Sequence, residues 1–591
     1  MILQSLVKYY DILANNNKVP KYGWSFVGVS YSINLSEDGH IKGIILNKYE
    51  KEFGKEKIYV PKQMIVPEHF SRCGQDPDAY FLCDNSKFIL GIDIEDSQKD
   101  IENCLKRFNK SKKLHLELLE DVDNPLAKAI CNFYKTWNPQ NAKENEFIKD
   151  NYEEITSGAN LIFCMSNENA QDDEDLKMVW DNYLECNSDS EVGICSVTGK
   201  YGNVARIHKK IKGVPGAQST GASLVSFNSE SLESYGKAQS YNAPVIDSTE
   251  FAYTTVLNYL LANKEYKIQL GDVTILFWSE TENNYYEDMF SFTINSTKDN
   301  QSEIYEIFQK IKTQRYIDID GIELDMNQNF CILGLSANVG RLSIQFFYEN
   351  TFGEILSNIK KHYDRLNIVA PKYCDKYLSV YDIVFSSMNL NAKEKPVKSM
   401  ISCMFQSIIS DLNYPERLYT SIIGRIRAEV GNVNYTRASF IKAFLVKNRR
   451  LEGEKFIMLN EDCKDVSYLL GRLFSILESV QLDSMQKSSA DGITTIKDKY
   501  FNSACKTPAS IFSTLMMLSN AHMKKLDRDN KGKMVYYDKI ISSILAGINS
   551  EGVPKVLSLE EQGKFILGYY HQTQKKFEKK TKETENKCNE Q

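Results

Sequence analysis

The segment FCILGLSANVGRLSIQFFYEN, residues 330–350, consists of two apolar runs that flank Asn338, Val339 and Gly340. An Asn and a Gly between apolar runs favour a turn, so the segment predicts two strands joined by a short connection. Beyond about Tyr377 the pattern changes, because apolar residues then recur every three or four positions, as on one face of a helix. These helical segments are residues 401–412, 415–430, 437–450, 465–481, 507–526 and 559–580. The sequence therefore predicts a C-terminal helical bundle after a central sheet.

Strands and helices also alternate on the N-terminal side of this segment. Residues 1–16 and 251–263 have helical spacing, and DVTILFWS, residues 272–279, is typical of a buried strand. Alternating apolar and polar residues with a turn at EDG, residues 37–39, predict an antiparallel β-meander. The strands of the meander are residues 24–36, 40–50 and 57–67. Helices are expected between about Ser97 and Thr156.

The predicted fold class is α+β, with a mixed N-terminal region of antiparallel β-meander and helices followed by the C-terminal helical bundle. A length of 591 residues favours roughly three to four domains. The predicted domains are an N-terminal α+β domain (residues 1–170), a central α/β region with a basic, glycine-rich nucleic-acid loop (residues 171–376) and the bundle (residues 377–591).

Composition favours a soluble cytoplasmic protein. The 13 cysteines include no Cys-x-x-Cys pair, which indicates reduced thiols. No uncharged apolar run reaches the roughly 18 residues that a membrane span needs. The net charge of -6 is unevenly distributed, since residues 200–229 hold five basic and no acidic residues. Residues 458–591 carry +3 and the rest of the chain -9.

The basic stretch RIHKKIKGVPGAQSTGASLVSFN, residues 206–228, combines cations with groups that contact a nucleic-acid backbone. Its glycines let the backbone approach a ligand closely, and its hydroxyl and amide groups are neutral donors. The stretch SYGKAQSYNAP, residues 234–244, adds Tyr235 and Tyr241, which are able to stack on bases. A glycine-rich surface loop beside a solvated basic strand is the alternative interpretation.

Standard catalytic signatures are absent from the sequence: there is no Walker A motif, no His-Glu-x-x-His and no Gly-x-Ser-x-Gly. The acidic segment with Asp318, Asp320, Glu323 and Asp325 is either a divalent-metal loop or, as we expect, a strand and turn with an outward acidic face. We expect a protein that is not an enzyme and binds no metal or cofactor. The contrasting hypothesis is a nuclease built from Asp318, Asp320 and His208.

Long motifs spread over nearly the whole chain resemble the large subunit of the type I-C CRISPR Cascade. They include YFLCDN (residues 80–85), CSVTGK (195–200), the basic stretch, SYGKAQSYNAP, LGLSANVGRLSIQFF (333–347) and LSLEEQGKFILGYYHQ (557–572). The resemblance implies a non-catalytic subunit that senses the protospacer-adjacent motif in duplex DNA, assists strand separation and holds the displaced strand. The implied partners are guide RNA, the backbone and guide-processing subunits, target double-stranded DNA and a nuclease-helicase. A purely structural scaffold is a third hypothesis.

Two groups of candidate contacts follow from these observations. Contacts with the nucleic-acid backbone are expected from Lys200, Arg206, His208, Lys209, Lys210, Lys212, Lys237, Lys497, Lys499, Lys524, Lys525 and Arg528. Motif reading is expected from Asn85, Gln218, Ser219, Thr220 and Gln239. The alternative for the amides is that they stabilise turns.

The resemblance also implies a small subunit made from the C-terminal region of the same gene, here residues 458–591. Met458 is the best candidate for an internal start, because it follows a basic helix and precedes a new one that Asn460 or Asp462 can cap. The alternative is one uninterrupted helical domain in which Met458 is a core residue.

Overall fold

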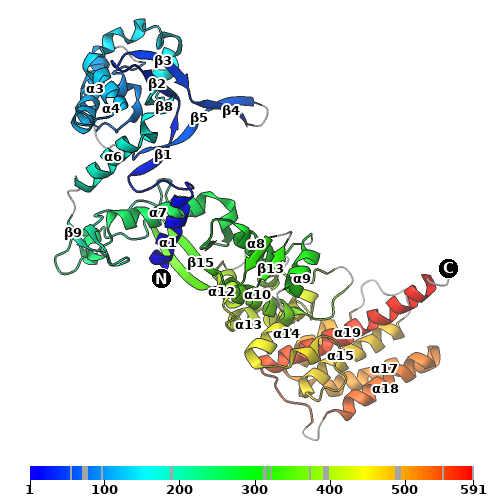
Figure 1. Cartoon of the computed structure of the whole chain (residues 1–591). Coiled ribbons are helices and arrows are strands. Elements are labelled where there is room, and N and C mark those ends of the chain that lie inside the picture. The colour runs from blue at the N-terminus through cyan, green and yellow to red at the C-terminus, as the bar shows by residue number, and fades with distance from the viewer. Residues whose placement is uncertain are drawn as a thin grey trace. The chain divides into compact units, whose positions relative to one another are not determined.

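The computed structural model describes residues 1–53, 56–69, 77–94, 97–186, 191–297, 299–310, 316–319, 322–371, 374–389, 398–485, 494–548 and 552–588. The chain forms two compact units (Figure 1). The first unit comprises Met1–Ile211 and Ser223–Tyr259, and the second comprises Lys212–Ala222 and Leu260–Gln591. Within the described ranges, no helix is both long and apolar enough to cross a membrane.

The first unit contains two sheets, and the chain passes directly from a strand of one sheet into a strand of the other. β1 (Trp24–Val29), β5 (Glu56–Pro67) and β4 (Lys48–Phe53) form an antiparallel sheet in the order β1-β5-β4. After Ser30 the chain enters the second sheet, whose order is β3-β2-β7-β6. Its strands are β2 (Tyr31–Leu35), β3 (Ile41–Leu46), β6 (Cys83–Asn85) and β7 (Asn160–Met165), and β8 (Glu168–Asn169) pairs with β7.

The second sheet is mixed, because β2 and β7 run parallel. Parallel neighbours need a long connection, and here it includes helices that help to bury the sheet. These are α2 (Ser86–Ile89), α3 (Gln98–Leu119), α4 (Pro125–Thr136) and α5 (Tyr152–Thr156). Ile33 of β2, Phe163 of β7 and Ile130 of α4 are fully buried in one hydrophobic core. The predicted hairpin at residues 37–39 is confirmed between β2 and β3, whereas the parallel pair is a feature that the alternation of residues did not predict.

Other elements of the first unit are α1 (Ile2–Asn15), α6 (Glu174–Cys186) and the short hairpin of β9 (Val192–Ile194) and β10 (Tyr201–Asn203). The first helix is confirmed, and it buries the apolar face that includes Leu6 and Leu13. Helix α7 (Asp247–Ala262) begins in the first unit and ends in the second.

The sheet of the second unit has the order β11-β12-β15-β16. Its strands are β11 (Lys267–Leu270), β12 (Val273–Ser279), β15 (Asn329–Asn338) and β16 (Arg341–Thr351). All residues of β12 are buried, as predicted for DVTILFWS. The two strands predicted in residues 330–350 are confirmed, and their turn contains Val339 with a positive φ of 54°. Next to this sheet lie α8 (Tyr285–Ile294), α9 (Gln301–Lys310) and the pair β13 (Tyr316–Ile319) and β14 (Ile322–Asp325).

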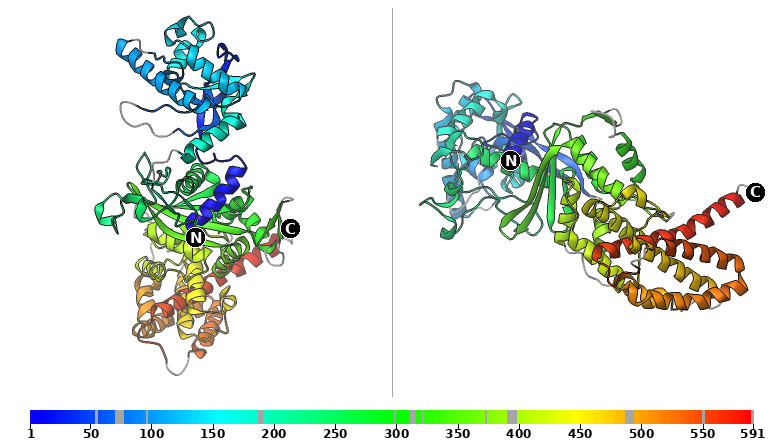
Figure 2. Two further views of the ribbon diagram at one scale, coloured as in Figure 1. Left: turned by 60° about the vertical axis from the view of Figure 1, so that its left-hand side comes forward. Right: turned by 90° about the horizontal axis from the view of Figure 1, so that it is seen from below.

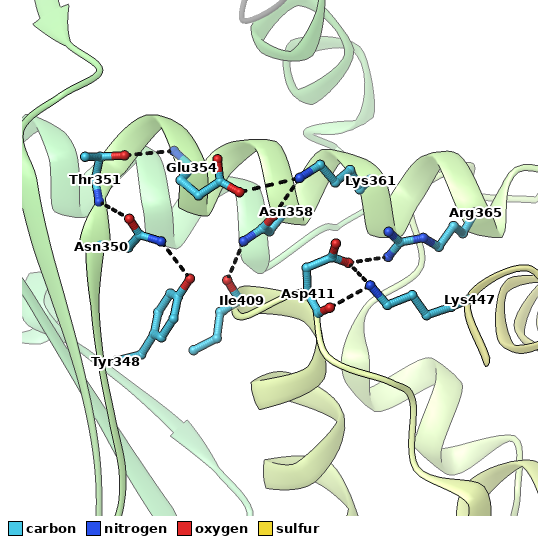
Figure 3. A network of polar contacts seen from close by, with 10 residues as sticks. All are labelled: Tyr348, Asn350, Thr351, Glu354, Asn358, Lys361, Arg365, Ile409, Asp411 and Lys447. Atoms are coloured by element: carbon cyan, nitrogen blue, oxygen red, sulfur yellow. Dashed lines mark hydrogen bonds and ion pairs between the residues drawn. The ribbon is translucent and has the colours of Figure 1, made fainter.

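Polar contacts connect this sheet to the helices that follow it (Figure 3). Helix α10 (Phe352–Leu366) starts directly after β16, and Thr351 caps it by accepting the Glu354 N–H. Asp411 then joins α10 to α14 (Tyr435–Arg449), because its carboxylate lies 2.8 Å from Nη1 of Arg365 and 2.6 Å from Nζ of Lys447. Burial opposes ionisation of Asp411, but these two cations hold its pKa below the usual value. Helices α11 (Val380–Phe385), α12 (Lys398–Ile409) and α13 (Glu416–Ala428) complete this region.

The C-terminal part of the second unit is a helical bundle. It consists of α15 (Val466–Ser484), α16 (Ile496–Lys506), α17 (Phe512–Asp529), α18 (Lys531–Ala546) and α19 (Leu559–Cys588). Figure 2 shows α17 and α18 side by side. The predicted α+β class with a C-terminal helical bundle is confirmed. The predicted boundaries at residues 170 and 376 stay predictions.

Two glycines allow α15 and α19 to pack backbone against backbone. A Cβ atom on Gly471 of α15 would lie 1.9 Å from the carbonyl oxygen of Phe565 in α19. A Cβ atom on Gly568 of α19 would lie 2.1 Å from the carbonyl oxygen of Tyr468 in α15. No side chain fits at either position. The close contact between the two helix backbones therefore requires glycine at both positions.

We expect Gly471→Ala to lower the free energy of unfolding by about 3 kcal/mol, because the added methyl group forces the two helix backbones apart. Gly424→Ala is the matched control, since Gly424 lies exposed within α13 and its Cβ would meet nothing within 4 Å. Alanine there should stabilise the helix by about 0.5–1 kcal/mol. Urea denaturation of the two purified variants measures both effects. Equal effects of the two substitutions would contradict the close helix contact.

Candidate nucleic-acid interface

The predicted basic stretch is divided between the two compact units. Arg206 and Lys209 belong to the first unit, together with Lys237, whereas Lys212 and Gln218 belong to the second.

Lys209 lies among acidic side chains of the first unit. Its ammonium forms an ion pair with Glu68, which follows β5, and lies 4.5 Å from the centre of the Phe251 ring. Its backbone N–H donates to the carboxylate of Glu250 in α7 over 2.6 Å. Glu250 is buried, and burial raises its pKa to about 7 although the Lys209 N–H and charge oppose the shift. Lys209 thus connects Glu68, which follows β5, to α7, and its ion pair offsets part of its positive charge although 45% of its side chain is exposed.

His208 is buried, with 3% of its surface exposed, and its Nδ1 lies 2.6 Å from the hydroxyl of Tyr253. Burial lowers its pKa to about 4, so the imidazole is neutral at pH 7. This position corrects the prediction that His208 contacts a nucleic-acid backbone, because the side chain is buried and its Nδ1 is engaged by Tyr253. The sequence pattern could not distinguish it from the exposed cations on either side.

The remaining cations of the stretch are exposed, as Lys209 is. Lys200, Arg206, Lys210, Lys212 and Lys237 all have exposed side chains. The guanidinium of Arg206 donates to Oε1 of Gln239 over 3.1 Å. Lys200 lines a surface hollow of the first unit with Lys21, Tyr22, Tyr201 and Asp247. This hollow carries charges of both signs.

The segment GVPGAQSTG (residues 213–221), the glycine loop, lies on the turn between β15 and β16. The Gln218 N–H donates to the carbonyl of Val339 over 3.0 Å, and Ala217 forms a bridge with the same residue. Gly213, Gly216 and Gly221 have φ values of 90°, 88° and 97°, which are conformations that favour glycine. The loop therefore has a defined backbone and exposes three consecutive neutral hydrogen-bonding side chains, those of Gln218, Ser219 and Thr220.

Asn85 stabilises a helix start. Its Oδ1 accepts the Lys87 N–H over 3.1 Å and so caps α2. The neighbouring Asp84 is buried and accepts the N–H groups of Tyr80 and Asn85. These contacts agree with the alternative that this amide stabilises a turn, and the capping bond occupies the carboxamide oxygen of Asn85.

The C-terminal cations lie on two helices of the bundle. Lys497 and Lys499 belong to α16, and the ammonium of Lys497 lies 5.9 Å from the centre of the Tyr569 ring. Lys524, Lys525 and Arg528 belong to α17. Arg528 pairs with the adjacent Asp529 over 3.0 Å, and both side chains are exposed, so this pair has little effect on stability.

The acidic segment contains the paired strands β13 and β14, and the expected turn falls on residues 320–321, which lie outside the described residues. β13 and β14 pair so that Asp318 lies opposite Glu323 in the register, while Asp320 lies outside the described residues. Among the described residues, no three His, Cys, Asp or Glu side chains are grouped so that they could hold a metal ion. The residues of the hypothetical nuclease site, His208 and Asp318, belong to different compact units.

Sequence reasoning missed the acidic surroundings of Lys209. Glu68 and Glu250 lie 141 and 41 residues away from it in the chain, so no local motif connects the three residues. The sequence shows the high density of positive charge in the stretch, but it does not show that the Glu68 carboxylate pairs with Lys209.

The chain belongs to the family described as CRISPR-associated protein (Cas_Csd1), whose model matches residues 6–577. A search of curated proteins found no match.

We expect the stability of the wild-type chain to fall as the pH rises from about 4.5 to 7, in part because of Glu250. Its pKa is about 7 when folded and near 4.5 when unfolded, so the folded state binds a proton more tightly and loses stability when that proton leaves. Glu250→Gln should flatten this dependence, since glutamine stays neutral and can still accept the Lys209 N–H. The thermal midpoint measured from pH 5 to 8 tests this expectation.

The matched control for this measurement is Glu230→Gln, because Glu230 is exposed. The control should follow the wild-type pH profile. Parallel profiles for the wild type and Glu250→Gln would show that the buried carboxyl does not titrate as expected.

Proposed function

We propose that this member of the family is the large subunit of a type I-C Cascade, an RNA-guided surveillance complex of antiviral defence. It recognises the protospacer-adjacent motif in invading double-stranded DNA, assists duplex opening and R-loop formation and holds the displaced strand. Guide pairing reads the rest of the target. The chain assembles with guide RNA and with the backbone and guide-processing subunits. It has no catalytic role of its own and presents the opened DNA to a separate nuclease-helicase.

The glycine loop is the observation that supports this proposal most. Three left-handed glycines and the bond from Gln218 to Val339 fix its backbone, while the amide and two hydroxyls remain exposed. A narrow loop with neutral donors and acceptors suits the edge of a base pair, where an anionic side chain would be repelled by the phosphates. Gln218 of this loop is the residue that we place at the motif.

The exposed cations of both units contact the phosphates of the DNA, and these contacts do not depend on the base sequence. Lys200, Arg206, Lys210, Lys212 and Lys237 are the ones from the basic stretch and its surroundings. Each phosphate contact adds affinity through counterion release, which is the same for every sequence. Lys209 contributes less than its neighbours, because Glu68 already pairs with it.

A triple variant with Gln218→Ala, Ser219→Ala and Thr220→Ala should separate motif reading from general binding. In the assembled complex we expect at least about tenfold weaker binding of a duplex that carries the adjacent motif, since base-edge contacts contribute about 1–3 kcal/mol each. Binding of DNA whose target region has been melted beforehand should change little. Titrations of both DNAs at one salt concentration measure the difference.

Gln140→Ala is a suitable control, because Gln140 is an exposed amide of the first unit with no predicted contact. It should bind both DNAs like the wild type. An equal loss on both DNAs in the triple variant would exclude a motif-reading role for the glycine loop.

The proposed small subunit of the complex comes from an internal start at Met458. Met458 is exposed, with 61% of its surface accessible, and lies between the short 3-10 helix Gly453–Phe456 and α15. It is therefore not a core residue, and a chain that starts there contains complete helices. The cap of α15 is Asp465, which accepts the N–H groups of Ser467 and Tyr468, so the expectation of a cap at Asn460 or Asp462 was wrong.

A separate product from Met458 would uncover one face of α19. In the full chain, the hydroxyl of Tyr419 in α13 donates to the carbonyl of Leu559, and Gly563 packs against Tyr419. Tyr570 donates to the carbonyl of Val369 over 2.8 Å. The uncovered face includes the buried Ile566 and Leu567, so the small subunit needs another protein surface in the complex.

Recoding Met458 to leucine should remove a small C-terminal product from the purified complex and weaken target binding, because the extra copies no longer add basic surface. Met178→Leu is the control, since Met178 is similarly exposed but lies in the first unit. Intact-mass analysis identifies the product. If only the full-length chain is present before and after recoding, the internal start is not used.

A further inference from the structure

The turn at residues 234–237 holds a tyrosine in an unfavourable backbone conformation. Tyr235 and Gly236 have φ values of 56° and 70°, and the Lys237 N–H donates to the carbonyl of Ser234 over 3.1 Å. Positive φ at both central positions is the geometry of a type I′ turn, which favours Asn, Asp or Gly. A tyrosine at the first central position is strained, because its Cβ crowds the backbone in the left-handed region.

Among the residues that the structure describes, no packing of the Tyr235 side chain compensates for this strain. The side chain of Tyr235 is 100% exposed, so it buries no area in the fold. A Cβ atom on the adjacent Gly236 would meet nothing within 4 Å, which places the tip of the turn in open space. Strained residues that stabilise nothing in the fold are found where a ligand or partner is bound.

Hydrogen bonds connect the residues at the base of the turn, whereas its tip is exposed. Asn242 accepts the Ser234 N–H over 2.8 Å and donates to the carbonyls of Lys237 and Gln239 over 2.6 and 2.8 Å. The Gln239 N–H in turn donates to the carboxylate of Glu233 over 2.9 Å. One side chain thus closes the loop from both sides and holds Tyr235 in a defined position.

The surroundings of the ring favour a nucleic acid over a protein. Lys237 is exposed two residues further on, and Arg206 is attached to the same loop through Gln239. The carboxylate of Glu233, the residue before the turn, accepts the Gln239 N–H. Ser234 and Gly236 provide no apolar rim around the ring, although aromatic anchors in protein interfaces are usually surrounded by one.

We infer that Tyr235 stacks on an unpaired nucleobase, while Lys237 and Arg206 contact the neighbouring phosphates. This inference rests on the proposed function and assigns to the turn a contact with the opened DNA. An aromatic ring with both faces exposed accepts any base, because every base has a π-face. The contact is therefore independent of sequence, unlike the one proposed for the glycine loop.

Variants at position 235 test the stacking contact in the assembled complex. The probes are a DNA with an opened target region and a fully paired duplex that carries the adjacent motif. Tyr235→Ala and Tyr235→Leu should bind the opened DNA about tenfold more weakly, which corresponds to about 1.4 kcal/mol, within the range for one stacked base. Tyr235→Phe and Tyr235→Trp should bind like the wild type. Tyr59→Ala is the control, because Tyr59 is an exposed tyrosine on a regular strand.

A stability measurement excludes a merely structural role. Tyr235→Asn should raise the thermal midpoint by about 1–3 °C, because asparagine suits the turn better, and should still weaken binding of the opened DNA as alanine does. A lower midpoint for this variant would overturn the inference. So would wild-type binding by Tyr235→Leu, or an effect of Tyr235→Ala on recruitment of the nuclease-helicase alone.

The two proposals fail in different ways. If the wild-type complex binds neither DNA probe, the proposed function is wrong and the inference falls with it. If the wild-type complex binds both probes and Tyr235→Ala binds each probe with the wild-type affinity, only the stacking contact is wrong.

Discussion

The contact between the backbones of α15 and α19 is the constraint on which the second unit depends. Gly471 and Gly568 lie at this contact, and each would place a Cβ atom within about 2 Å of a carbonyl oxygen of the other helix. Because the helices approach so closely, α19 lies deep in the bundle and packs against α13 and α14 as well as α15. Its residues Phe565, Ile566 and Leu567 are fully buried as a result. The bundle and the region around the sheet thereby share one hydrophobic core.

Polar pairs inside this contact fix the register of the two helices. The hydroxyl of Tyr569 donates to Glu478 over 2.8 Å, and Nε of Arg472 donates to Oε1 of Gln572 over 3.2 Å. Burial lowers the pKa of His571 to about 3, so this residue is neutral where its Nδ1 meets the Tyr468 hydroxyl. A shift of one residue would leave these groups buried without partners, at a cost of about 1–3 kcal/mol for each group. Apolar packing alone would not select one register so strictly.

The charge distribution bears on the proposed binding of nucleic acid. Lys209 is paired inside the first unit and His208 is neutral, so the basic stretch is less positive than its composition indicates. The exposed cations and the glycine loop remain, and in the proposed function they contact phosphates and base edges separately. A net charge of -6 is compatible with the proposed function, because excess negative charge in the rest of the chain limits indiscriminate binding to DNA.

The sequence by itself determined the α+β class, the first helix, the hairpin of residues 330–350 and the helical character of the C-terminal third, because these depend on local periodicity and turn residues. It also identified the glycine loop, because glycine is favoured where the backbone has a positive φ, as it has at Gly213, Gly216 and Gly221. Only the tertiary structure decided that β2 pairs in parallel with β7, that Lys209 meets Glu68, that His208 is buried and that Tyr235 is exposed on a strained turn. Pairing, burial and charge neutralisation depend on residues far apart in the chain, and a local pattern carries no information about which distant residues will meet.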